Sequence, residues 1–60
     1  MTPGEFFKGD LVGFYSAAEN IFRKGVVRSD PMGRHLVYRV RTFTGDVFEV
    51  PQVLLERLVN

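Results

Sequence analysis

Apolar and polar residues alternate along most of the chain after Gly9, a period of two that predicts β-strands. Turn-forming residues interrupt the alternation at short intervals. The predicted strands cover residues 11–15, 22–29, 34–43, 47–50 and 54–59. We therefore expect an all-β protein built from five short strands.

Residues 23–43 are the most informative segment, because folding them into a hairpin separates apolar from basic side chains. Asp-Pro-Met-Gly at 30–33 is typical of a tight turn, which would pair Val27 with Leu36. The core face of this hairpin then consists of Val27, Leu36, Gly25, Tyr38 and Val40. The opposite, predicted basic face carries Lys24, Arg28, His35, Arg39 and Arg41, with Phe22, Val26 and Val37 among them.

A second hairpin follows, and its pattern agrees with the first. A three-residue loop with Gly45 in the left-handed conformation pairs Val40 with Phe48 and Arg39 with Glu49. Val40 and Phe48 then point inward. Arg39 and Glu49 meet on the outer face, where their ion pair is worth at most about 1 kcal/mol.

Two segments leave an alternative open. Ser-Ala-Ala-Glu at 16–19 fits a helix capping box and Gly25 could end a helix, so residues 16–24 form either a loop, which we favour, or a short helix. Pro51 interrupts strand pairing. We expect a tight or 3₁₀ turn at 51–53 before the last strand, and the alternative is one short helix over 52–58.

Residues 1–8 are expected to form an N-terminal arm, because Pro3 and Gly4 break local structure ahead of Phe6 and Phe7. The two phenylalanines are expected to plug one end of the fold. From Gly9 onward we find no linker, so residues 9–60 are predicted to form a single domain.

Four strands, a proline-marked turn and a fifth strand favour a small, partly open barrel of the SH3-like type, since closing a sheet protects its edges. The hydrophobic content of 45% can fill a small core. The chain has no cysteine, which leaves neither a disulfide nor a thiolate zinc site to stabilise 60 residues. Self-association could supply that stability.

Composition restricts the function classes. The net charge of +1 falls short of the strongly basic balance of a dedicated nucleic-acid binder, so any positive patch must come from segregation of charge. No apolar run reaches the roughly 20 residues that span a membrane, and the first residues do not resemble a secretory signal. The expected location is the cytoplasm.

Several short motifs carry a resemblance to known proteins. They are Gly-Asp-Leu-Val at 9–12, Gly-Val-Val at 25–27, Val-Phe-Glu-Val-Pro at 47–51 and Leu-Leu-Glu-Arg-Leu at 54–58. The pattern resembles the SH3-like barrels of Tudor and KOW domains. Over about residues 9–59 it is most similar to the plasmid-borne, trimethoprim-resistant type II dihydrofolate reductases.

The resemblance implies a scaffold more than an activity. Reductase chemistry in that family depends on Val-Gln-Ile-Tyr just before the proline and on a lysine after the Gly-Asp. Here Val-Phe-Glu-Val stands at 47–50, and Phe14 falls near the lysine position. The resemblance therefore implies an SH3-like fold, self-association and a phage or plasmid protein, with a reductase relative as a further alternative.

Catalytic and metal-binding patterns are not found in the sequence. His35 is the single histidine and is expected to be a surface strand residue beside a turn, not a catalytic base. One histidine with scattered carboxylates gives no metal-ligand spacing, and the glycines form no phosphate-binding motif. We expect no enzyme activity, cofactor or metal.

The leading functional hypothesis is a non-enzymatic binding or adaptor module that acts through the 22–43 hairpin, with nucleic acid marginally preferred as partner. Basic side chains would contact phosphates, while His35 or nearby aromatic rings would stack on bases. The predicted site comprises Lys24, Arg28, His35, Arg39, Arg41, Phe22, Val37 and Phe43. The alternatives are an acidic protein partner, a homo-oligomer interface, and an ordinary solvated strand face.

Overall fold

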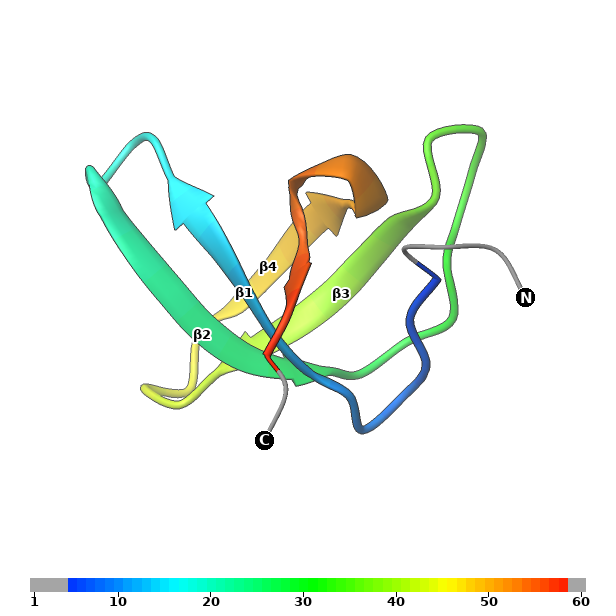
Figure 1. The fold of residues 1–60 in the computed structure, drawn as a ribbon, viewed down its shortest axis with the longest axis horizontal. Coiled ribbons are helices and arrows are strands. Elements are labelled where there is room, and N and C mark those ends of the chain that lie inside the picture. Colours follow the sequence, from blue (N-terminus) through cyan, green and yellow to red (C-terminus); the bar gives the residue numbers. More distant parts are fainter. Residues whose placement is uncertain (1–4, 59–60) are drawn as a thin grey trace.

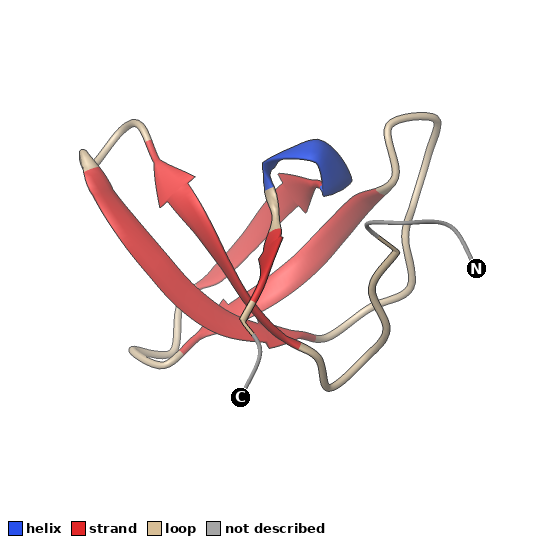
Figure 2. Cartoon of the chain, in the orientation of Figure 1, coloured by secondary structure: helices blue, strands red, loops and turns tan. Residues whose placement is uncertain are grey.

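One antiparallel sheet of five strands forms the body of the protein, in the order β4-β3-β2-β1-β5 (Figure 1). The computed structural model describes residues 5–58. The strands are β1 (Leu11–Ser16), β2 (Ile21–Val27), β3 (Val37–Thr42), β4 (Val47–Pro51) and β5 (Glu56–Arg57). Figure 2 shows how the sheet bends without closing, since β4 and β5 remain separate edges. The prediction of an all-β, five-stranded, partly open barrel is confirmed.

The hydrophobic core lies on the inner side of the bent sheet, where strand alternation places it. In β3, for example, Tyr38 and Val40 are buried while Arg39 and Arg41 between them are exposed. The core consists of Phe6, Val12, Phe14, Val27, Tyr38, Val40, Val50 and Leu55, with Phe48 packed against it.

The predicted register of the β2–β3 hairpin is wrong by four residues. Val27 pairs with Val40 and not with Leu36. The tight turn lies at 33–36 instead of 30–33: Gly33 has a φ of 74° and Leu36 a φ of 53°, and the Leu36 N–H donates to the Gly33 carbonyl at 3.2 Å. Residues 28–36 therefore form a longer loop, and Leu36, predicted in the core, is 42% exposed.

The predicted division of strand side chains between the two faces of the hairpin is still correct, because a shift by an even number of residues keeps each side chain on its own side of a sheet. Gly25, Val27, Tyr38 and Val40 are buried as predicted. Gly25 also allows the two strands to approach closely, since a Cβ there would overlap the Arg41 carbonyl.

The second hairpin forms as predicted. Val40 pairs with Phe48 and Arg39 with Glu49. Gly45 has a φ of 95° in the connecting loop, the left-handed conformation expected of it.

The two segments with alternatives are both resolved in favour of the first reading. Residues 17–20 form a turn in which the Asn20 N–H donates to the Ser16 carbonyl at 2.7 Å, and β2 starts at Ile21, so no helix forms there. The 3₁₀ turn η1 (Gln52–Leu54) follows β4 and is the only helical segment within residues 5–58. The last strand is shorter than the predicted 54–59, and Val59 lies outside the described residues.

The described part of the N-terminal arm closes one end of the core. Phe6 is buried and packs edge-on against Tyr38, with ring centroids 5.6 Å apart. The Phe6 N–H donates to the Tyr38 hydroxyl at 3.2 Å, and that hydroxyl donates to Gln52 Oε1 at 3.3 Å. Phe7, in contrast, is exposed. Residues 1–4 of the predicted arm lie outside the described residues.

A search for membrane-spanning helices among residues 5–58 finds none that is long and apolar enough.

Candidate functional site

The outer side of β2 and β3 carries most of the predicted site in regular cross-strand rows. Val26 lies opposite Arg41. The Phe43 N–H donates to the Lys24 carbonyl at 3.4 Å, so Phe43 and Lys24 form the next row on one side. We call the set of outward residues the β2–β3 surface; its members are Phe22, Lys24, Val26, Arg28, Val37, Arg39, Arg41 and Phe43.

On the other side of the Val26–Arg41 row, two arginines lie opposite each other. The Arg28 N–H donates to the Arg39 carbonyl at 2.8 Å. Like charges directly opposite each other destabilise a sheet, so this row favours an anion. Arg39 is partly neutralised by Glu49 on β4, with Nη2 and Oε2 3.5 Å apart on exposed side chains.

The remaining cations of this surface have no acidic partner in the described part of the chain. Within residues 5–58, no carboxylate oxygen lies within 4.0 Å of the charged atoms of Lys24, Arg28 or Arg41. Glu49, which pairs with Arg39, lies diagonal to Arg41 on the neighbouring strand, and Glu56 pairs with Gly13 on β1. Gly13 in turn pairs with Lys24, so Glu56 lies two strands away, about 9.5 Å. The surface therefore keeps a net positive charge.

Two arginines outside this surface, Arg23 and Arg57, form ion pairs with carboxylates of the protein. Arg23 points inward from β2, and its guanidinium lies 5.2 Å from the centre of the Phe48 ring. It forms ion pairs with Glu19 at 2.8 Å and Asp46 at 3.0 Å. It also donates to Thr44 Oγ1 at 2.8 Å. Arg23 thus joins the β1–β2 and β3–β4 turns across the open side of the barrel.

Arg57 plays a similar part at the N-terminal end. It pairs with Asp10 at 2.8 Å and lies over the Phe6 ring at 4.9 Å. The Phe7 N–H donates to Asp10 Oδ2, and this bond together with the Arg57 guanidinium lowers the pKa of Asp10 below its usual value. Two of the seven Asp and Glu carboxylates thus form ion pairs with Arg23, and a third forms one with Arg57.

Exposed aromatic rings gather at one end of the β2–β3 surface. Phe43 is 69% exposed and Phe22 43% exposed. Together with Lys24 they line a hollow of about 330 Å³. Tyr15 on β1 lies opposite Phe22 and is 54% exposed. This end therefore combines accessible rings with a cation.

The Phe22 ring lies across the neighbouring strand β1, in space that is free because Gly13 has no side chain. A Cβ at Gly13 would overlap the Cζ and Cε2 atoms of the Phe22 ring, so the ring lies over Gly13. The role of Gly13 in the structure is to leave room for the ring on the outer face, where the ring also shields this glycine from solvent.

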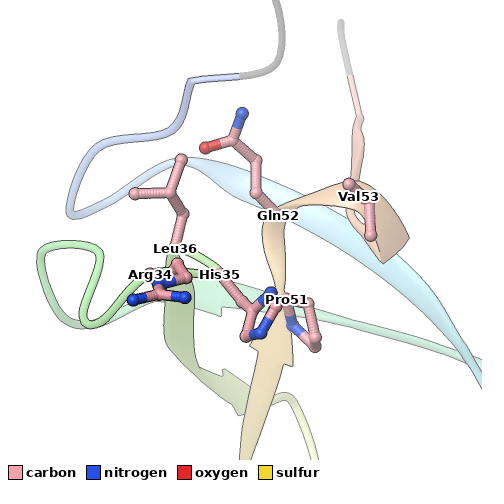
Figure 3. A pocket seen from close by; sticks show the side chains of 6 residues that line it. All are labelled: Arg34, His35, Leu36, Pro51, Gln52 and Val53. Atoms are coloured by element: carbon pink, nitrogen blue, oxygen red, sulfur yellow. The ribbon is translucent and has the colours of Figure 1, made fainter.

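His35 does not belong to this surface, contrary to the prediction. The longer β2–β3 loop places it in the 33–36 turn, while Phe43 follows β3 at the other end of the sheet (Figure 1). His35 instead helps to line a separate hollow of about 430 Å³ beside Pro51 (Figure 3). That hollow is formed by Arg34, His35, Leu36, Pro51, Gln52 and Val53.

The hollow at His35 has little chemistry to offer. Its lining contains no carboxylate and no second imidazole that could orient His35 as a base. Among residues 5–58 there is also no group of three potential metal ligands. The β2–β3 surface is the stronger candidate for a binding site.

Seven of the eight predicted site residues thus share the β2–β3 surface, with Val37 half-buried at its far end and His35 excluded. Tyr15 was missed, although its position after inward-facing Phe14 is a signal that it points outward. Comparisons of the chain with protein-family models, with curated proteins and with solved structures give no match. Any function must therefore be inferred from the surface itself.

Proposed function

We propose that this protein is a non-enzymatic binding module, an SH3-like barrel of the cytoplasm, that binds nucleic acid through the β2–β3 surface. The observation that supports this most directly is a line of cations, Lys24, Arg41 and Arg28, that have no acidic partner within residues 5–58, followed by Arg39. Phosphate oxygens are natural partners for such a row, because arginine binds them with paired N–H donors. The exposed rings of Phe22 and Phe43 add surfaces on which bases can stack.

The proposal predicts a steep dependence on salt. If four cations each neutralise one phosphate, the slope of log affinity against log salt is about −2.8 for a single strand and −3.6 for a duplex. Between 50 and 200 mM salt, affinity for a single strand should then fall by about 50-fold.

Arg41→Ala and its matched control, Arg34→Ala, test the site by fluorescence anisotropy. Both variants lose one exposed arginine, but only Arg41 lies on the β2–β3 surface. Arg41→Ala should weaken binding and bring the slope closer to zero by about 0.7–0.9, whereas Arg34→Ala should leave the slope near that of the parent protein. Equal effects of the two variants, or affinity independent of salt, would count against the proposal.

A protein-interaction or homo-oligomerisation module is the second candidate. Exposed apolar residues interleaved with arginine are typical of protein interfaces, and Phe43 and Val47 are the most exposed of those near Arg41. Sedimentation velocity over a range of concentrations tests the homomeric version, which a strict monomer excludes.

The motif resemblance to type II dihydrofolate reductases keeps a third candidate, a reductase relative. Glu49 and Val50 stand where that family has isoleucine and tyrosine. An assay of dihydrofolate-dependent NADPH oxidation decides it, and no activity in a confirmed tetramer excludes it.

A further inference from the structure

The arrangement of rings and cations on the β2–β3 surface carries information about the form of the nucleic acid. We infer that the surface binds a single strand in preference to a duplex, with bases stacked on Phe43 and Phe22 and the backbone following Lys24, Arg41 and the Arg28–Arg39 row. This inference rests on the proposed function and names the substrate class of the same site.

The spacing of the rows suits an extended strand. Outward residues on one strand lie two positions apart, about 6.7 Å. From the Lys24–Phe43 row to the Arg28–Arg39 row the cations therefore span about 13 Å. The interval of about 6.7 Å between rows is comparable with the distance between successive phosphates of an extended single strand, so each of the four cations can contact one phosphate. A strand of about four nucleotides would cover the cations and the rings, at the low end of the footprint of small single-strand binders.

The rings argue against a duplex. Phe43 exposes 69% of its surface at the start of the β3–β4 loop, and Phe22 is held across Gly13 beside Lys24. A ring can stack only on a base whose face is accessible, and the bases of a duplex are stacked on one another. The two rings have no such partner in a duplex, whereas an unpaired strand presents a base to each.

The charge supports the same occupant. No carboxylate lies within 4.0 Å of Lys24, Arg28 or Arg41 among residues 5–58. A bound anion would also reduce the repulsion between Arg28 and Arg39, which lie opposite each other. The cations lie in a line along β2 and β3 that starts at the aromatic end with Lys24 and ends at Arg28 and Arg39. A single strand of nucleic acid has one phosphate and one base per nucleotide, so it can pair with the cations and stack on the rings at the same time.

Three fluorescein-labelled probes of twelve units separate the possibilities: oligothymidylate, an abasic strand with the same phosphates, and a twelve-base-pair duplex. We expect oligothymidylate to bind at least about fivefold more tightly than the abasic strand, the low limit for one stacked base. It should also bind more tightly than the duplex.

Phe43→Leu tests the ring without removing a charge. It should lower affinity for oligothymidylate at least about fivefold while leaving affinity for the abasic strand unchanged, and Phe43→Trp should retain tight binding. Val53→Ala is the matched control, because Val53 is an exposed apolar residue away from this surface. Circular dichroism confirms that each variant is folded.

The outcomes distinguish this inference from the function on which it rests. Equal, salt-dependent binding of all three probes, or tighter binding of the duplex, would overturn the single-strand preference and leave nucleic-acid binding in place. If Phe43→Leu weakens the abasic strand as much as oligothymidylate, stacking is also overturned. No binding of any probe at low salt overturns both proposals.

Discussion

Replacing Arg23 with methionine should destabilise the protein by about 1–3 kcal/mol, a large share of the roughly 3–9 kcal/mol expected for 60 residues. Methionine keeps an aliphatic stem that can still pack near Phe48 but removes the guanidinium. The Arg23 side chain is only 12% exposed, so its charge interactions are less screened than those of an ordinary surface arginine.

The magnitude follows from the contacts that are lost. Ion pairs with exposed carboxylates are worth about 0.2–1 kcal/mol each, which applies to both Glu19 and Asp46. The cation–π contact with Phe48 adds about 0.5–1 kcal/mol. Both carboxylates remain accessible to water in the variant, so no large penalty for a buried, unpaired charge is added. For a chain of this length, each kcal/mol lowers Tm by about 8 °C.

Thermal and urea unfolding, followed by circular dichroism at low and at high salt, measure the effect. The difference between the parent protein and Arg23→Met should shrink at 1 M salt, where the Debye length is about 3 Å. Arg34→Met is the control, since no ion pair of Arg34 is present among residues 5–58. If Arg23→Met costs no more stability than Arg34→Met, the two turns are not joined by Arg23 as described.

Two further predictions concern the N-terminal end of the core. Tyr38→Phe should lower the free energy of unfolding by about 1–3 kcal/mol, measured by urea unfolding, because the Phe6 N–H loses its acceptor in a buried setting; an unchanged midpoint would contradict this. Asp10→Asn should destabilise the protein near neutral pH, and its deficit should begin to shrink as pH falls below about 4, near the unfolded pKa, and disappear below the folded pKa. The pKa of Asp10 is lowered in the folded state by the Phe7 N–H and by Arg57, so the stability it contributes is present above its unfolded pKa and is lost as pH falls through the folded one. Unfolding of both proteins from pH 2 to pH 7 measures this, and a deficit that grows on acidification would contradict it.

The division of the chain into faces could be predicted because it depends only on the two-residue period of a strand. Arg39 and Val40 alternate whichever partner they have, and the β3–β4 register follows from a short loop whose glycine admits one common geometry. These local rules were enough to place the β2–β3 surface on the outside and Tyr38 in the core.

The register of the β2–β3 hairpin could not be predicted from its turn residues. Asp30-Pro31 is ordinary turn chemistry, but the chain reverses at 33–36, where leucine at position 36 adopts a left-handed conformation that its residue type disfavours. The cost is offset by tertiary contacts such as the hydrogen bond from the Gln52 N–H to the Leu36 carbonyl at 3.0 Å. Contacts of that kind depend on the whole fold, and His35 was misplaced for the same reason.

The position of Arg23 illustrates a second limit. Strand alternation points it inward, where an arginine is unexpected, and its partners Glu19 and Asp46 come from two different turns. Only the bent sheet brings these turns together across its open side. The sequence alone offers no rule that joins them.

The ring of Phe22 occupying the space above Gly13 ties two positions on neighbouring strands to each other. Any relative that carries a side chain at 13 would have to give up a large ring at 22, or turn it elsewhere. The two positions should therefore vary together across such relatives. Glycine at 13 should occur with an aromatic residue at 22, and a larger residue at 13 with a smaller one at 22, because the two side chains share one volume.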